Sequence, residues 1–84
     1  MGWFVYILEC NDATYYTGIT TDIGRRIQEH EEGRGAKYTK GRAPLKIVYR
    51  EECEDRSSAS KREMEIKSLS KEDKVALFST SANH

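Results

Sequence analysis

Alternating apolar and polar positions near the start of the chain predict a β-hairpin. Residues 3–10 alternate as a strand does, and residues 14–19 are again rich in β-branched and aromatic side chains. Residues 11–13 between them carry turn chemistry, so the two runs are expected to pair. A third strand is predicted at residues 45–50, where Pro44 suits the first position of a strand.

The first amphipathic helix is predicted directly after the hairpin. Thr21 or Asp22 can cap its start, and the helical pattern runs to about Glu32. Gly33 then supplies the left-handed residue that ends many helices. Residues 33–43 hold three glycines among basic residues, so a loop or a short irregular helix is expected there.

A second long helix is predicted from Asp55 through Leu69. Residues 70–73 resemble a capping box, which indicates a short last helix that ends near Phe78. Residues 79–84 are expected to fray.

Together, these elements predict one domain over residues 1–84, because so short a chain can build only one modest core. The predicted fold class is α/β (α+β), a small sandwich in which helices flank a three-stranded, mainly antiparallel sheet. No apolar run approaches the ~20 residues that cross a bilayer, and no signal-peptide pattern is present. Two cysteines without paired spacing argue against a disulfide scaffold, so we expect a cytoplasmic protein with no membrane partner.

The formal net charge is zero, which argues against a binder of nucleic acid that works by overall charge. The distribution of charge argues the other way, because the stretch from residue 34 to residue 50 has six basic side chains and no acidic one. Tyr38 and Tyr49 offer a stacking platform nearby. The alternative is a solvated basic loop beside an acidic helix. Five basic side chains are the candidate nucleic-acid contacts: Arg34, Lys37, Lys40, Arg42 and Lys46.

Helical geometry brings two polar groups to the core edge of the first helix. Ile23 and Ile27 form its buried stripe, and Arg26 and His30 border that stripe on one side. Either group has a purely structural alternative: Arg26 can cover the core edge with its stem, and His30 can be a satisfied edge histidine.

On the second helix, Glu63 falls inside the stripe that Ala59, Ile66 and Ser70 define. A glutamate in such a place is costly unless it is paired or binds a cation. It can also form a salt bridge with Arg26 and have no further role.

Combined with two tyrosines, these groups form a pattern much rarer than any one of them. Phe4-Val5-Tyr6 ends one motif and Tyr16-Thr17-Gly18 forms the next, followed by Arg26, His30 and a glutamate on a later helix. Over residues 3–78 the chain resembles the GIY-YIG nuclease superfamily, and in particular its small stand-alone bacterial members. It departs from the pattern at Phe4, where the family name has glycine, and at Ile19, where some relatives have lysine.

The resemblance implies a role for each of these side chains. Glu63 would be the sole protein ligand of one divalent cation, Mg²⁺ or Mn²⁺, with waters filling the shell. Arg26 would hold the scissile phosphate. Tyr6 and Tyr16 would position or deprotonate the attacking water, and His30 would assist proton transfer. Tyr6 as a base needs a cation that depresses its pKa, and His30 is the competing base.

The function that the resemblance implies is a metal-dependent endonuclease that hydrolyses phosphodiester bonds in DNA. Its substrates would be structured or single-stranded DNA in repair or recombination, and RNA stays open as a substrate. Two alternatives keep the fold without the chemistry: a non-catalytic nucleic-acid-binding module, and a subunit that needs a protein partner to supply DNA specificity. The complete set of polar groups favours the nuclease, since a non-catalytic module could lose Glu63 or Arg26 at little cost.

Overall fold

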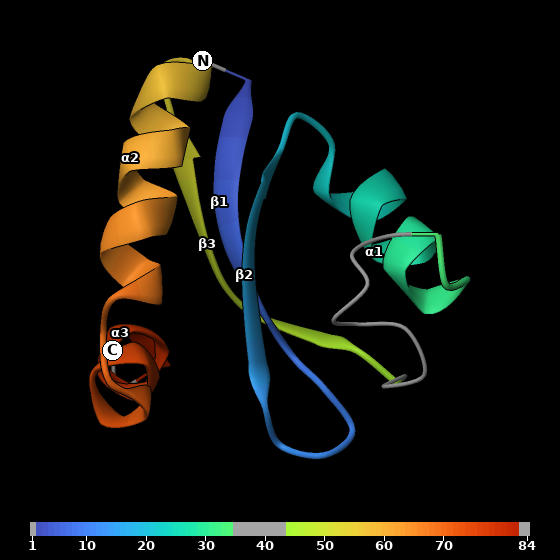
Figure 1. Cartoon of the computed structure of the whole chain (residues 1–84), viewed down its shortest axis with the longest axis vertical. Coiled ribbons are helices and arrows are strands. Elements are labelled where there is room, and N and C mark those ends of the chain that lie inside the picture. Colours follow the sequence, from blue (N-terminus) through green and yellow to red (C-terminus); the bar gives the residue numbers. More distant parts are fainter. Residues whose placement is uncertain (1, 35–43, 83–84) are drawn as a thin grey trace.

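The computed structural model of the chain describes residues 2–34 and 44–82. Three strands form one sheet at its centre (Figure 1): β1 (Trp3–Glu9), β2 (Tyr15–Thr20) and β3 (Lys46–Cys53). β1 lies in the middle, so the order across the sheet is β2-β1-β3. Both pairings are antiparallel, which confirms the predicted hairpin and the predicted sheet.

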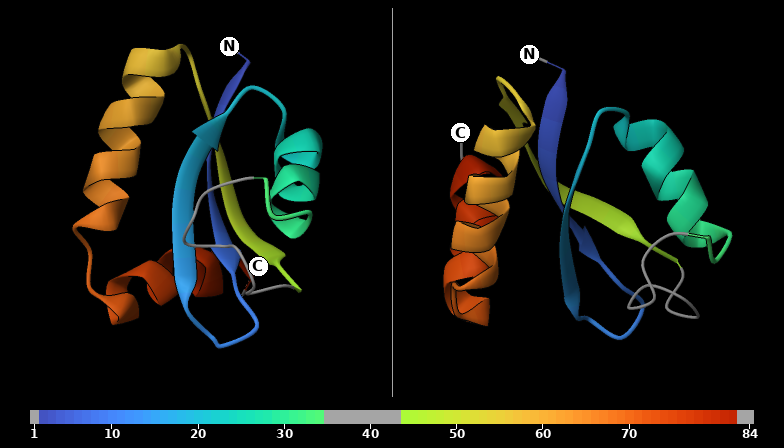
Figure 2. Two further views of the ribbon diagram at one scale, coloured as in Figure 1. Left: turned by 45° about the vertical axis from the view of Figure 1, so that its right-hand side comes forward. Right: turned by 45° about the horizontal axis from the view of Figure 1, so that its top comes forward.

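Three helices cover the two faces of this sheet. α1 (Ile23–Glu31) lies against one face, and α2 (Arg56–Lys67) and α3 (Lys71–Ala82) lie on the other, as Figures 1 and 2 show. The predicted sandwich of mixed α/β class is therefore confirmed. Within the described ranges, no helix has the length and apolar character needed to cross a membrane.

The side chains of β1 alternate between two core clusters. Val5 and Ile7 are fully buried under α2. Tyr6 points to the opposite face, where Ile23 and Ile27 of α1 pack against its cluster and stay half-buried. Because side chains alternate along a strand, Tyr6 places its hydroxyl on the face that α1 covers.

The helices begin where the sequence predicts. Asp22, Asp55 and Ser70 each accept a hydrogen bond from the backbone N–H three residues further on. Of the two caps considered for α1, Asp22 is the one used. Gly33 follows α1 with a φ of +80°, as predicted for a left-handed stop.

The buried stripe of α2 is confirmed at two of its three positions. Ala59 and Ile66 are fully buried. Ser70 is exposed instead, because it lies beyond the end of α2 and its hydroxyl caps α3.

β3 is longer than the sequence pattern indicates. It continues past Arg50 to Cys53, because this stretch pairs with Trp3 and the residues that follow it in β1. The acidic residues there suggest a loop, but the ladder to β1 and a side-chain network override that preference. Glu51 accepts a hydrogen bond from the Tyr49 hydroxyl at 2.7 Å and one from Arg62 Nε at 3.0 Å.

α3 also extends past its predicted end near Phe78, to Ala82. The Phe78 ring packs against Tyr15 of β2, with 5.6 Å between ring centroids. This contact ties α3 to the sheet at the position where the sequence predicts that the helix stops. Part of the segment expected to fray is therefore helical.

Candidate active site

Tyr6 and Gly18 face each other across the β1–β2 ladder. A Cβ atom at position 18 would lie 2.6 Å from the Tyr6 hydroxyl oxygen and 3.0 Å from the Tyr16 ring. Real Cβ atoms do not approach other atoms so closely, so only glycine leaves room here. Gly18 thereby makes the space in which the two tyrosine rings meet, with centroids 6.4 Å apart.

His30 reaches the same place from α1. The residue is 1% exposed, and its Nε2 lies 2.9 Å from the Tyr6 hydroxyl oxygen. Its imidazole also meets the Tyr16 ring edge-on, with 5.3 Å between centroids. The histidine expected at the core edge is thus fully buried between the helix and both tyrosines.

Arg26 brings a positive charge close to the Tyr6 hydroxyl. Its Nη1 donates to Glu29 Oε1 at 3.0 Å, and its guanidinium is also a hydrogen-bonding partner of the Tyr6 side chain. A guanidinium can only donate, so the Tyr6 oxygen is the acceptor in its contact with Arg26.

Burial controls the protonation of both rings. It raises the pKa of Tyr6 to about 12; the neighbouring Tyr16 adds to this rise, and the hydrogen bond and charge of Arg26 only partly offset it. Burial also lowers the pKa of His30, helped by the Arg26 charge and opposed by Glu29. At neutral pH, Tyr6 is therefore a protonated phenol and His30 a neutral imidazole. Arg26 acts on Tyr6 in the expected direction, but burial outweighs it.

Glu63 comes from α2, which lies on the other face of the sheet. Its charge contributes to raising the pKa of Tyr6, so its carboxylate lies within electrostatic reach of that hydroxyl. Its side chain is 21% exposed, and its Oε2 lies 3.3 Å from Lys67 Nζ. Over residues 2–34 and 44–82, no ion pair joins Glu63 to Arg26, so the alternative in which they simply neutralise each other is not observed.

Tyr6 therefore contacts, or interacts electrostatically with, each of the other candidate catalytic residues. We call the five residues the tyrosine cluster: Tyr6, Tyr16, Arg26, His30 and Glu63.

Glu63 is the member of this cluster that can hold a metal ion. The described part of the chain contains no group of three or more His, Cys, Asp or Glu side chains placed to bind one. A single, partly exposed carboxylate fits Mg²⁺, which keeps most of its waters and binds proteins through one or two carboxylates and substrate phosphates. In this structure Lys67 balances the charge of that carboxylate.

The comparison with known proteins identifies the family of the chain. The model of the GIY-YIG catalytic domain family matches residues 2–76. The chain belongs to the GIY-YIG family. The GIY-YIG domain implies a nuclease family that interacts with nucleic acid, and nucleases with this domain typically use divalent metal ions.

Several relatives carry the GIY-YIG domain of this chain under the name UPF0213. The UPF0213 protein DP2720 from Desulfotalea psychrophila is 58% identical over 80 residues, which are 94% of this chain and 73% of that protein. The UPF0213 protein VNG_2274C from Halobacterium salinarum is 53% identical over 74 residues, 88% of this chain and 96% of that protein.

Two solution NMR structures share the GIY-YIG fold of this chain. The UPF0213 protein BH0048 from Bacillus halodurans superposes with a TM-score of 0.61 at 46% identity, covering 95% of this chain and 85% of that one. The protein EF2693 from E. faecalis gives a TM-score of 0.63 at 38% identity, covering 96% and 88%. The fold and the family predicted from sequence are both confirmed.

The candidate nucleic-acid contacts are either exposed on the described part of the chain or lie outside the described ranges. Arg34 is exposed after α1 and forms an ion pair with Glu32. Lys46 is exposed at the start of β3. The Tyr49 ring packs against the core cluster under α2 and its hydroxyl donates to Glu51, which does not suit a stacking platform. The remaining predicted residues lie outside the described ranges: Lys37, Tyr38, Lys40 and Arg42.

Two charged residues that pair with members of the tyrosine cluster were not predicted from the sequence. Glu29 pairs with Arg26, and Lys67 pairs with Glu63. Both pairs have the spacing of three or four residues that brings side chains together on a helix. Both partners can therefore be found by looking for an opposite charge three or four residues after Arg26 and Glu63.

Proposed function

We propose that the chain is a metal-dependent endonuclease that hydrolyses phosphodiester bonds in structured or single-stranded DNA during repair or recombination. The tyrosine cluster is the observation that carries the proposal. It gathers a phenol pair, an imidazole and a guanidinium at one hydroxyl, with the Glu63 carboxylate within electrostatic reach, in a chain of a nuclease family. Cys10 and Cys53 are free thiols, which suits the reducing cytoplasm as its compartment.

Exposure divides the cluster into two layers. The side chains of Arg26 and Glu63 are 32% and 21% exposed, so both can reach a substrate. We assign Arg26 to the scissile phosphate, where it offsets charge on the nonbridging oxygens. Glu63 is assigned to a divalent ion, Mg²⁺ or Mn²⁺, which when bound supplies charge stabilisation at the phosphate and an acidified water.

The buried layer consists of Tyr6 and His30, each 1% exposed. A phenol with a pKa of about 12 keeps its proton at neutral pH. Tyr6 therefore cannot readily accept a proton as the general base. Tyr16 is half-buried, and its ring lies against the rings of both Tyr6 and His30. We therefore assign the contact with the attacking water to Tyr16, and the positioning of Tyr16 and Arg26 to the Tyr6–His30 pair.

Replacing Glu63 with Gln tests the proposal. The exchange removes the anionic ligand and keeps the shape, so cleavage should fall by orders of magnitude because metal-assisted charge stabilisation is worth several kcal/mol. Cleavage is measured on flap, fork, nicked and single-stranded DNA, with Mg²⁺ or Mn²⁺ against EDTA, and on RNA of matched sequence. Glu65→Gln is the matched control, since Glu65 is exposed on the same helix and pairs with Arg62.

Equal cleavage by the wild type and by Glu63→Gln would contradict the assignment of the site. Cleavage of RNA in preference to DNA would correct the substrate. The control variant should keep wild-type activity on every substrate.

One observation favours the second candidate function, a non-catalytic nucleic-acid-binding module. Lys67 already neutralises Glu63 at 3.3 Å, so the glutamate has a structural partner without any metal. In that case the wild type would bind DNA with a strong salt dependence and cleave none of the substrates in either metal.

A further inference from the structure

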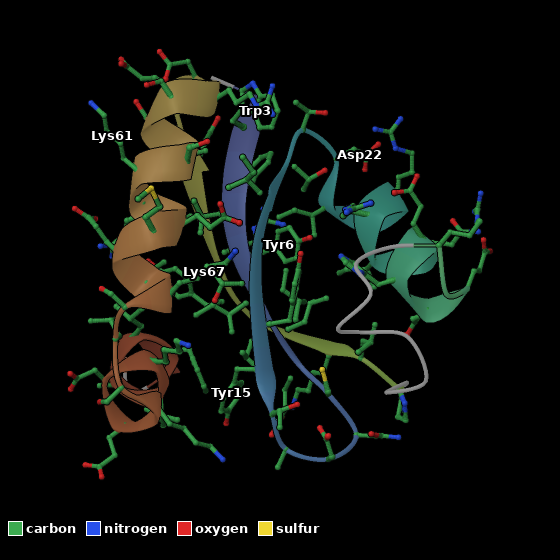
Figure 3. The ribbon with its side chains drawn as sticks, viewed as in Figure 1. Trp3, Tyr6, Tyr15, Asp22, Lys61 and Lys67 are labelled. Atoms are coloured by element: carbon green, nitrogen blue, oxygen red, sulfur yellow. The ribbon has the colours of Figure 1, made fainter. Side chains whose placement is uncertain are left out.

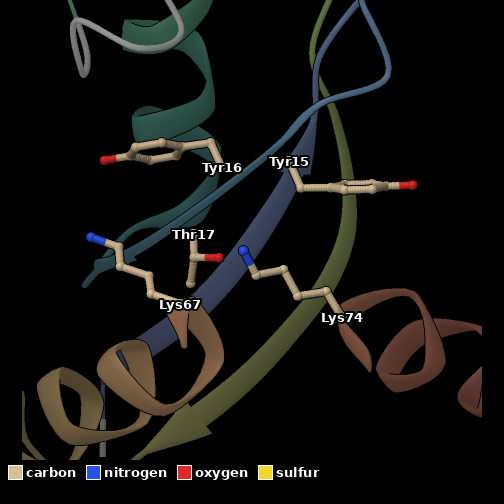
Figure 4. Close-up of a pocket in the computed structure, with 5 residues that line it drawn as sticks. All are labelled: Tyr15, Tyr16, Thr17, Lys67 and Lys74. Atoms are coloured by element: carbon tan, nitrogen blue, oxygen red, sulfur yellow. The ribbon is translucent and has the colours of Figure 1, made fainter. Parts of the chain in front are cut away.

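A polar hollow of about 240 Å³ lies beside the tyrosine cluster, at the edge strand β2. We call it the β2 pocket, and Figure 4 shows the residues that line it: Tyr15, Tyr16, Thr17, Lys67 and Lys74. A second hollow of about 160 Å³ adjoins it, shares Tyr15 and Lys74 with it, and adds Thr14 and Lys71.

Thr17 gives the β2 pocket an unused hydrogen-bonding group. The residue is 3% exposed, and its hydroxyl has no hydrogen-bond partner among the residues described. Buried hydroxyls are nearly always paired, because an unpaired one loses its bonds to water without replacement. The motif that names the family has isoleucine at this position, so the fold itself does not need a hydroxyl there. A ligand that displaces the side chains over this hydroxyl would supply the missing partner.

Lys67 and Lys74 bring two positive charges to the same hollow from α2 and α3. The Thr17 side chain lies between the two lysine side chains in Figure 4. In the described ranges Lys74 forms no ion pair, and the partner of Lys67 is Glu63. Two ammonium groups and one hydroxyl form a donor set that suits an anion.

The rest of the local charge agrees with an anionic ligand. Lys71 lies over the Tyr15 ring at 5.6 Å from its centroid, so a third ammonium group stands at the mouth of the adjoining hollow. Glu72 and Asp73, the acidic residues in the first turn of α3, are exposed and do not line either hollow.

The β2 pocket is continuous with the tyrosine cluster. Tyr16 belongs to both, and Lys67 joins the pocket to Glu63 through their ion pair. Because β2 is an edge strand, side chains from both faces of the sheet meet at its outer side. A strand of nucleic acid held at Arg26 and Glu63 would therefore continue along this edge.

We propose that the β2 pocket binds a backbone phosphate of the nucleic-acid strand, next to the phosphate that is cleaved. Lys67 and Lys74 supply the charge, and the Thr17 hydroxyl donates a hydrogen bond to a phosphate oxygen. The inference rests on the proposed function, since it takes nucleic acid as the ligand.

The test measures binding without catalysis. A fluorescein-labelled oligothymidylate of about 12 nucleotides, long enough for one such domain, is titrated in EDTA at several salt concentrations. Lys74→Ala should weaken binding about eightfold at ~50 mM salt and reduce the salt slope by about 0.7, as expected for one lost phosphate contact on single-stranded DNA. Lys61→Ala is the matched control, because Lys61 is exposed and points away from the sheet in Figure 3. It should leave both quantities unchanged.

Thr17→Val gives a second, independent reading. Valine has the same shape without the hydroxyl, so the melting temperature should stay the same or rise while the affinity falls at least about threefold. A purely structural threonine would show no loss of affinity. Inorganic phosphate, titrated in place of the oligonucleotide, should bind much more weakly; if it bound equally well, the pocket would be a site for a free anion.

The outcomes separate this inference from the proposed function. Equal losses of affinity in Lys74→Ala and Lys61→Ala, or full affinity in Thr17→Val, would contradict phosphate binding in the β2 pocket. Neither result would bear on the proposed metal-dependent hydrolysis at Glu63. Loss of affinity in Lys74→Ala and Thr17→Val, together with a wild type that cleaves no substrate, would support phosphate binding in the β2 pocket and contradict the endonuclease activity.

Discussion

Gly18 shows how a single absent side chain shapes the candidate site. The Tyr6 hydroxyl oxygen lies only 2.6 Å from the place that a Cβ atom at position 18 would take, and it also lies 2.9 Å from His30 Nε2. The contact between two strands and a helix therefore depends on one glycine in β2. The resemblance to the family identifies this glycine as part of a motif, and the structure supplies its physical reason.

Replacing Gly18 with Ala should destabilise the protein by about 1–3 kcal/mol, because the Tyr6 ring has to move out of a packed core. Urea unfolding measures the loss. Gly24→Ala is the matched control, since a Cβ there would lie at an ordinary 3.7 Å from Asp22 Oδ1 and alanine favours the helix. It should stabilise by up to about 1 kcal/mol. The same sign for both substitutions would contradict the role given to Gly18.

In the part of the chain that the structure describes, the β1–β2 turn holds the non-glycine residue with a positive φ. Ala13 has a φ of +65°, in the left-handed region that glycine tolerates and other residues rarely adopt. Two backbone hydrogen bonds hold the turn, from Cys10 N to Thr14 O at 2.8 Å and from Ala13 N to Cys10 O at 3.0 Å, and Asp12 Oδ1 also accepts from Thr14. The hairpin thus forms in spite of its turn residue, because the ladder on either side fixes the chain.

Ala13→Gly should therefore stabilise the hairpin by up to about 1 kcal/mol, the size of the left-handed penalty for a non-glycine residue. The identical substitution at Ala76, which is exposed in α3, should destabilise by about 1 kcal/mol because glycine is a poor helix former. Thermal unfolding of both variants measures the difference. A loss of stability in Ala13→Gly would show that the turn is not strained.

For the whole molecule, the buried imidazole links folding to pH. His30 closes the core under α1, and its pKa lies below its ordinary value because burial disfavours the charged form. The unfolded chain then binds the proton more readily than the folded one. Stability should accordingly fall as the pH drops below about 6.5, the ordinary pKa of histidine, until the lowered folded pKa is passed.

His30→Gln should remove this component of the pH dependence. Glutamine can still accept from the Tyr6 hydroxyl but does not titrate, so the gap in unfolding free energy between pH 7 and pH 5 should be smaller than in the wild type. Urea unfolding at a series of pH values provides the comparison. Parallel curves for the two proteins would contradict a buried, neutral His30.

Features that depend on local spacing can be predicted from the amino-acid sequence. Period-two alternation gave β1 and β2, side chains that accept from backbone N–H groups gave the starts of all three helices, and Gly33 gave the end of α1. The members of the tyrosine cluster were also named from sequence, through the family motif. The strand, cap and stop signals each lie within a few residues, so no tertiary contact is needed to read them.

The way in which distant parts of the chain meet depends on tertiary packing. β3 passes Arg50 because β1 offers it a ladder, and α3 passes Phe78 because a ring of β2 packs against it. α1 and α2 lie on opposite faces of the sheet, yet His30 and Glu63 both act on one Tyr6 hydroxyl. The β2 pocket joins one strand and two helices that are far apart along the chain. Contacts of this kind form only once the core packs. The same packing buries the Thr17 hydroxyl without giving it a hydrogen-bond partner among the described residues.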